Sequence, residues 1–386
     1  MSTNQSIPQT KKRISSIDIL RGLVMLFMLL DHVRERFFYH MPISDPINID
    51  DTSTGLFFSR ILAHLCAPVF VFLTGLSAWL YAHPKGKTPR SASSFLWKRG
   101  LFLILIEITL INFSWFGDYK TLYLQVIWAI GVSMISLALL SKLDLKWIGL
   151  LGFVIVFGHN MLTSIHLNED QIGYTIWTVL YQRGFILPND FIAIKASYPV
   201  LPWIGVILLG YFTGPLFVGE KFNAEERLKT LVKIGLSCLG LLLVIRGFNI
   251  YGETLPWEKQ DTFIQSVMSF LNFKKYPPSL DFILLTIGIG CFLLYLFEKM
   301  QNRFTEFLRT YGSAPMFFYI LHLYVLLIAY KILVNVYGTN QGEYFGFDHL
   351  WQIWLCTIAL SLVLFYPTKK FSDYKRKSTS KWIKYF

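Results

Sequence analysis

Residues 18–32, Asp18-Ile19-Leu20-Arg21-Gly22-Leu23-Val24-Met25-Leu26-Phe27-Met28-Leu29-Leu30-Asp31-His32, decide the fold of this chain. The run is apolar and long enough to enter a bilayer as a helix, yet it holds ionisable side chains, which are costly at membrane depth and mark polar paths or functional sites. At about 100° per residue, Arg21 and His32 share nearly the same helix face, roughly 16 Å apart along the axis. We therefore predict that this helix lines a polar path. The simpler alternative is a first helix with a charged entry and a charged exit.

Composition places the rest of the chain in a membrane. The 386 residues are 54% hydrophobic and 16% charged, whereas a soluble domain is usually about a quarter charged. The apolar residues fall in blocks of about twenty, the length that a helix needs to cross the hydrocarbon core, and lipid cannot satisfy open backbone. We predict an all-α, polytopic membrane bundle of about ten transmembrane helices. The predicted spans are 16–36, 57–81, 98–116, 121–140, 147–162, 199–218, 230–249, 279–298, 313–336 and 349–367.

Basic residues set the predicted orientation. Most Lys and Arg side chains fall in connections that share one side if the N-terminus is cytoplasmic, as the positive-inside rule requires. We therefore expect both termini in the cytoplasm, with a disordered polar leader over 1–13, a transmembrane domain over 14–368 and a basic tail over 369–386 on the inner leaflet. The net charge of +12 is explained in this way, so no nucleic-acid partner is predicted. An eleventh span at 172–187 would break this register, so that segment is interpreted as interfacial or re-entrant.

The sequence shows no common soluble-enzyme motif and no metal-ligand spacing. All four cysteines lie in apolar segments, so we expect free thiols without a disulfide framework or a metal. Neither a nucleotide-binding P-loop, a nucleophile elbow nor a zinc motif is present. The expected location is the plasma (inner) membrane, with multiple passes and the lipid bilayer as partner.

Polar side chains within or near other predicted spans gather at two depths. Lys98 and Arg99 begin the third span at the cytoplasmic side, where a basic pair is either an anchor or a phosphate ligand. Glu107 lies in the middle of that span and needs a partner, for which an arginine is expected. The other candidates lie toward the external half or mid-membrane, and for each a structural role competes with a site role. They are His64, His159, Asn160, Tyr276 and His322.

A set of motifs in fixed order resembles the multi-span acyltransferases of the heparan-alpha-glucosaminide N-acetyltransferase-like family, over about residues 14–370. Each motif is weak alone, whereas the ordered set is specific. The motifs are Ser16-Ile17-Asp18-Ile19-Leu20-Arg21-Gly22, Asp31-His32, His64-Leu65-Cys66-Ala67-Pro68, Arg99-Gly100 with Glu107, Gln125-Val126-Ile127-Trp128, Gly158-His159-Asn160, Tyr198-Pro199-Val200-Leu201-Pro202-Trp203, Lys275-Tyr276-Pro277-Pro278-Ser279 and Phe317-Phe318-Tyr319-Ile320-Leu321-His322. The spacing of Arg21 and His32 also resembles the first helix of bacterial membrane O-acyltransferases, where that Arg and that His matter for activity.

The resemblance implies an enzyme that moves an acyl group, expected to be acetyl, from cytoplasmic acyl-CoA to a sugar or glycan amine or hydroxyl at the external face. Acetyl-CoA is then the donor, and a histidine takes part in the chemistry. The animal lysosomal enzyme uses a histidine of its first luminal loop. His40 lies in that loop here, but its surroundings do not match, so His32 and His64 are preferred.

On this reading, His32 is the general base or the acyl carrier, because an imidazole near neutrality suits proton abstraction. Asp31 or His64 would orient it. The expected CoA phosphate ligands are Arg21, Lys98 and Arg99, and the expected acceptor ligands are His159, Asn160, Tyr276 and His322. The alternative function is a transporter or flippase for a glycan or lipid precursor, without covalent chemistry. The sequence leaves open whether the chain acts alone or as a homodimer.

Overall fold

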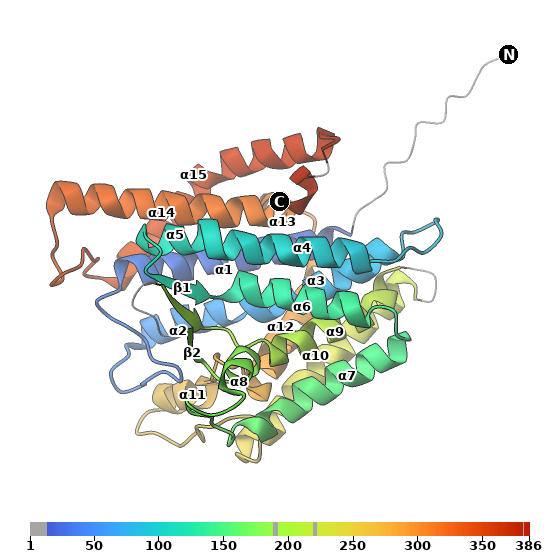
Figure 1. Cartoon of the computed structure of the whole chain (residues 1–386), viewed down its shortest axis with the longest axis horizontal. Helices are drawn as coiled ribbons and strands as arrows, with labels where there is room; N and C mark the ends of the chain where they lie inside the picture. The colour runs from blue at the N-terminus through green and yellow to red at the C-terminus, as the bar shows by residue number, and fades with distance from the viewer. Residues whose placement is uncertain (1–13, 188–191, 219–221, 381) are drawn as a thin grey trace.

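The computed structural model describes residues 14–187, 192–218, 222–380 and 382–386. It is mostly helical, as predicted, and most of the long helices run in roughly one direction (Figure 1). The longer helices are α1 (Ser15–Phe37), α2 (Thr54–His64), α3 (Cys66–Ala82), α4 (Ser93–Ile106), α6 (Val126–Leu140), α7 (Leu145–Gly158), α9 (Leu201–Phe212), α10 (Ala224–Gly247), α12 (Leu280–Lys299), α14 (Pro315–Tyr337) and α15 (Leu350–Lys377). The others are α5 (Asn112–Phe116), α8 (Tyr174–Leu180), α11 (Phe263–Leu271), α13 (Arg303–Ser313, as long as α2), the π-helix η1 (Glu107–Ile111) and the 3₁₀ helices η2 (His159–Leu162), η3 (Gly214–Phe217) and η4 (Trp382–Tyr385).

Every predicted span overlaps a helix, although not every helix is long. Within the described residues, six helices are long and apolar enough to cross a membrane, with α2 and α3 counted as one unit and α7 extended by η2. α6 and α9 are apolar but shorter. α1 has 23 residues but is too charged to count among the six. Ten crossings and cytoplasmic termini therefore stay predictions, while the helical membrane architecture agrees with the sequence.

A small sheet departs from the all-α prediction. β1 (Thr121–Leu124) pairs parallel with β3 (Ala193–Ala196), and β3 pairs antiparallel with β2 (Gly184–Leu187). The predicted span 121–140 was therefore wrong at its start, which is a strand, and the predicted re-entrant piece 172–187 forms α8 and β2. The sheet lies at one end of the helices (Figure 1). It also places Tyr198, whose backbone N–H donates to the Leu124 carbonyl at 3.2 Å.

α1 is the helix around which the others pack, and buried residues cover most of its faces. It contacts α2, α3, α12, α13, α14 and α15. The approach to α13 is closest where Gly22 meets Gly312. A Cβ on Gly22 would lie 1.8 Å from the Leu308 carbonyl oxygen, and one on Gly312 would lie 1.8 Å from the Asp18 carbonyl oxygen. Because the backbones touch, only glycine fits at these positions.

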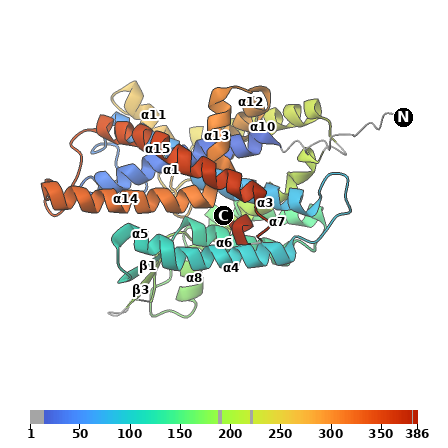
Figure 2. The same ribbon diagram turned by 90° about the horizontal axis from the view of Figure 1, so that it is seen from above.

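The C-terminal helix also packs on this core rather than standing apart. α15 runs obliquely to α14 (Figure 2) and contacts α1, α13 and α14, and it continues to Lys377, past the boundary predicted at residue 368. Tyr385 of η4 lies over Phe102 of α4, with their ring centroids 5.5 Å apart. Part of the predicted tail therefore belongs to the folded body.

Candidate functional site

One cavity of about 310 Å³ follows α1 between two polar ends. At one end it is lined by Arg21, Arg99 and Lys375, which we call the basic end. At the other it is lined by Asp31, His32 and Lys275, which we call the imidazole end. Between them the wall is mainly apolar, with residues such as Met25, Met28, Cys66, Phe70 and Ile130. The two ends contain Arg21 and His32, the side chains that helical periodicity predicted on one face of α1.

The basic end combines side chains from three helices. Arg21 donates to Asp18 at 2.9 Å and to the Ser77 hydroxyl at 3.1 Å. Arg99 on α4 and Lys375 on α15 line the same space, and Lys375 donates to the Ser313 carbonyl at 3.2 Å. Lys98, by contrast, is exposed on the outer side of α4 and does not line the cavity. The structure thus brings together Arg21 and Arg99 of the predicted phosphate ligands, adds Lys375 and leaves out Lys98.

At the imidazole end, the contact of His32 is His322. His32 Nδ1 lies 2.7 Å from His322 Nε2, and His322 Nδ1 lies 2.7 Å from the Phe318 carbonyl oxygen. A carbonyl only accepts, so His322 Nδ1 carries a proton and, in the neutral ring, its Nε2 accepts from His32 Nδ1. The chain of bonds fixes the tautomer of His32 with its Nε2 lone pair free. Neither Asp31 nor His64 supplies this contact, contrary to the orientation expected from the sequence.

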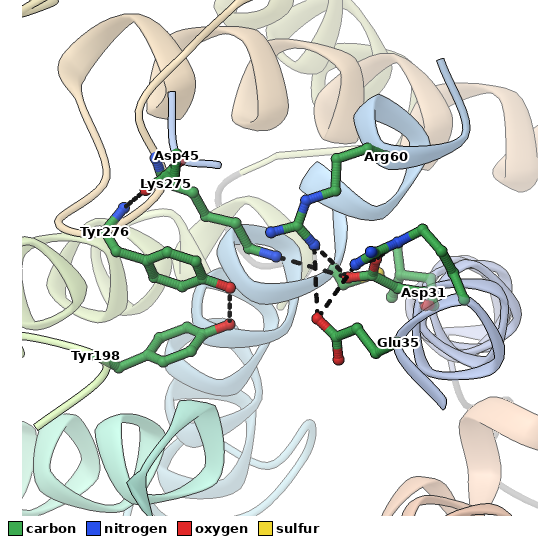
Figure 3. Close-up of polar contacts among 10 residues, drawn as sticks. Asp31, Glu35, Asp45, Arg60, Tyr198, Lys275 and Tyr276 are labelled. Atoms are coloured by element: carbon green, nitrogen blue, oxygen red, sulfur yellow. Dashed lines mark hydrogen bonds and ion pairs between the residues drawn. The ribbon is translucent and has the colours of Figure 1, made fainter. Parts of the chain in front are cut away.

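Asp31 is held by cations instead. Its Oδ1 accepts from Arg34 at 2.8 Å and its Oδ2 from Arg60 at 2.7 Å. Lys275 Nζ lies 3.8 Å from Oδ2, and Glu35 lies 3.3 Å from Arg34. Figure 3 shows the side chains of Arg60, Lys275 and Glu35 converging on Asp31, beside a pair of tyrosines. Because both carboxylate oxygens are occupied, Asp31 serves this cluster rather than the imidazole.

Tyr198 lies at this end of the cavity and contacts Tyr276, which does not itself line the cavity. Their hydroxyl oxygens lie 3.1 Å apart (Figure 3), and Tyr198 lines the cavity. Burial, followed by the neighbouring Tyr276, raises the pKa of Tyr198 well above its usual range. Tyr198 is therefore a neutral hydroxyl at any physiological pH. The predicted site residue Tyr276 takes part through this contact.

Residues 273–279 form a strap that carries Lys275 and Tyr276 to the cavity, and it is fixed from several sides. Asp45 accepts from the backbone N–H groups of Lys275 and Tyr276, each at 2.9 Å (Figure 3). His159 Nε2 donates to the Pro278 carbonyl at 2.8 Å. Asn160 accepts from the backbone N–H of Leu280 at 2.8 Å, where the strap enters α12. The structure thus places His159 and Asn160 against the strap, outside the cavity.

A buried carboxyl supports the same strap. Glu253 accepts from the backbone N–H of Lys274 at 2.9 Å. Its burial raises its pKa to about 7, because a charged carboxylate is poorly solvated there. The strap is therefore packed in a water-poor environment and held by fixed donors and acceptors, which makes the position of Lys275 well defined.

Two further residues that the sequence singled out, His64 and Glu107, have structural contacts and do not line the cavity. His64 is buried, lies against the Phe282 ring with centroids 5.1 Å apart, and does not line the cavity. Glu107 accepts from the backbone N–H of Trp128 at 3.0 Å, so it caps the start of α6, whose first N–H groups need an acceptor. The expected arginine partner of Glu107 is not found among the described residues.

Sequence reasoning gave no site role to Arg34, Arg60, Tyr198, Lys275 or Lys375. Arg34 follows the first helix's Asp31-His32 motif without a role of its own, Arg60 was noted only for sharing a face of the second predicted span with His64, and Lys375 lay in a tail expected to bind lipid. Only Tyr198 and Lys275 carried a signal, because both belong to the ordered motifs. Their meeting depends on contacts between distant segments, and those appear only in the fold.

A protein-family model matches this chain. The family model described as heparan-alpha-glucosaminide N-acetyltransferase, catalytic, matches residues 13–244, which is more than half of the chain. The matched region contains Arg21, Asp31, His32 and Arg99, and it ends before Lys275. No curated protein matches the chain.

Proposed function

Because the chain belongs to the heparan-alpha-glucosaminide N-acetyltransferase family, a family of membrane acyltransferases, we propose that it transfers an acyl group from cytoplasmic acyl-CoA to a sugar amine or hydroxyl at the external face. The observation that carries the proposal is a cavity that is lined by the cations Arg21, Arg99 and Lys375 at one end and by His32 at the other, with His322 hydrogen-bonded behind His32. Acetyl is the expected acyl group, with acetyl-CoA as donor, and the inner membrane is the expected location.

The negatively charged phosphates of the CoA donor match the cations of the basic end. CoA carries several phosphate groups, and Arg and Lys are their natural ligands. Arg21, Arg99 and Lys375 would hold these phosphates at the cytoplasmic side, with the linear pantetheine arm in the apolar middle of the cavity. This arrangement brings the thioester toward His32 without moving the phosphates into the membrane, where their desolvation would be costly.

His32 would carry out the proton transfers, and His322 would position it. His32 Nε2 takes the proton from the amine or hydroxyl as it attacks the thioester carbonyl carbon. The carbon–sulfur bond then breaks, and the imidazolium returns the proton to the CoA thiolate. His322 is the positioning residue, since its hydrogen bond to Nδ1 of His32 keeps Nε2 as the basic atom.

CoA binding provides the direct test, read as thermal stability of the purified protein. A ligand at 100 times its Kd stabilises the folded state by about 2.7 kcal/mol, so CoA is expected to raise the Tm. Arg99→Met removes a cation from the basic end and is expected to weaken CoA binding about 10- to 100-fold, since a hydrogen bond to a charged group contributes about 1.5–3 kcal/mol.

Lys98→Met is the matched control, because Lys98 lies next to Arg99 but faces away from the cavity. It should leave the CoA-induced shift in Tm unchanged. Absence of any CoA effect on the wild type would contradict the proposal and favour the transporter or flippase alternative, which has no reason to bind an acyl donor.

A further inference from the structure

The side chain of Lys275 ends in an ammonium group with three N–H donors, and none of them makes a hydrogen bond within the part of the chain that the structure describes. Its side chain is 5% exposed and lines the cavity beside Asp31 and His32. The nearest carboxylate oxygen, Asp31 Oδ2, is 3.8 Å away, which is too far for a hydrogen bond. That oxygen already accepts from Arg60 at 2.7 Å. The Lys275 ammonium is therefore a buried cation that faces the cavity and has no close acceptor among the described residues.

The charges around Lys275 also favour an anion beside its ammonium group. Two carboxylates, Asp31 and Glu35, face three cations, Arg34, Arg60 and Lys275. A buried charge without compensation is unfavourable, so an excess positive charge at this point is expected where an anion arrives or forms. The strap holds Lys275 in place through Asp45, His159 and Asn160, which suits a group that acts without reorganising.

We propose that Lys275 is a catalytic residue that stabilises the oxyanion of the tetrahedral intermediate. The inference rests on the proposed acyl transfer. As the acceptor atom bonds to the thioester carbon, His32 takes its proton and the carbonyl electron pair moves onto oxygen. Lys275 donates a hydrogen bond to that oxyanion. When the carbonyl re-forms, the carbon–sulfur bond breaks and the CoA thiolate recovers the proton from His32. No further reactant is needed.

The test measures binding and needs no knowledge of the acceptor. Two CoA derivatives serve as probes: acetonyl-CoA, a ketone in place of the thioester, and trifluoroacetonyl-CoA, whose hydrate resembles the tetrahedral intermediate. The wild type should bind the second more tightly, by about 10² or more, as transition-state analogues do. In Lys275→Met the ratio of the Kd of acetonyl-CoA to that of trifluoroacetonyl-CoA should fall close to one, while the Kd of acetonyl-CoA stays within about twofold of the wild-type value. Acyl transfer should lose about 10²–10³ in kcat, as on removal of an oxyanion donor.

Two controls make the result specific. Lys274→Met changes the neighbouring lysine of the strap, which does not line the cavity, and should keep the full preference. Lys275→Met itself should fold, because Asp31 and Glu35 remain balanced by Arg34 and Arg60, and unchanged Tm in detergent would verify this. Lys275→Arg, which retains a cation donor, should recover part of the preference.

The outcomes separate this inference from the proposed function. Equal preference in wild type and Lys275→Met, or no preference in the wild type, would overturn the role of Lys275 while leaving acyl transfer intact. A raised KM for the acceptor with an unchanged analogue preference would also overturn it, since Lys275 would then anchor an acidic acceptor. Failure of the wild type to bind either CoA derivative would instead refute the proposed function, and the inference with it.

Discussion

Replacing His32 by asparagine is expected to lower the rate of acyl transfer by about 10²–10⁴-fold, the contribution typical of a general base. The asparagine amide N–H stands at the position of His32 Nδ1 and can still donate to His322 Nε2, which lies 2.7 Å from Nδ1, so the packing should survive while the basic Nε2 is lost. Transfer of labelled acetyl from acetyl-CoA to glucosamine measures the effect. Because the basic end is untouched, the CoA-induced shift in Tm should persist in this variant.

His166→Ala is the control for this prediction, because His166 is an exposed histidine outside the cavity. Its transfer rate should match the wild type. The competing assignment from the sequence makes His64 the base. Retained transfer in His32→Asn together with loss in His64→Phe would remove His32 from the mechanism and contradict the assignment made from the cavity.

Gly22→Ala or Gly312→Ala is expected to destabilise the protein by at least about 3 kcal/mol, above the usual range for an added methyl group in a packed core. Each new Cβ would lie 1.8 Å from a carbonyl oxygen of the partner helix, and a backbone cannot yield as a side chain can. Relief requires separation of α1 from α13. Since Arg21 donates to the Gly312 carbonyl at 3.3 Å, the basic end should be disturbed as well.

Gly240→Ala is the matched control, since a Cβ there meets nothing within 4 Å and Gly240 lies inside α10. Alanine should stabilise that helix by about 0.5–1 kcal/mol. Tm and the yield of monodisperse protein in detergent measure both effects. Wild-type stability in Gly22→Ala and Gly312→Ala would show that the two helices do not touch as the structure has them.

Most of the helical fold could be predicted from the sequence, because long apolar runs are a strong local signal. The sheet could not. Its strands are four residues long, and β1 pairs with a segment about seventy residues later. Strand preference depends on such neighbours more than on local sequence. The amphipathic helix α13 was also missed, because its polar face removes the signal used to find spans.

The sequence predicted which candidate site residues share α1, but not how residues on other helices meet them. The 3.6-residue period placed Arg21 and His32 on one path, and both line the cavity. The period could not tell that Arg99 faces inward and Lys98 outward, which depends on how α4 meets α6. Nor could it reveal His322 beside His32, because 290 positions separate them. The functional roles of these residues stay predictions.

The central claim is that one cavity joins a phosphate-binding end to a histidine base. A cryo-EM structure of the protein with bound CoA tests it most directly. We expect phosphate density against Arg21, Arg99 and Lys375, with the pantetheine arm in the apolar middle and the thiol directed at His32. CoA bound elsewhere, or a cavity closed by packed side chains between the two ends, would contradict the account.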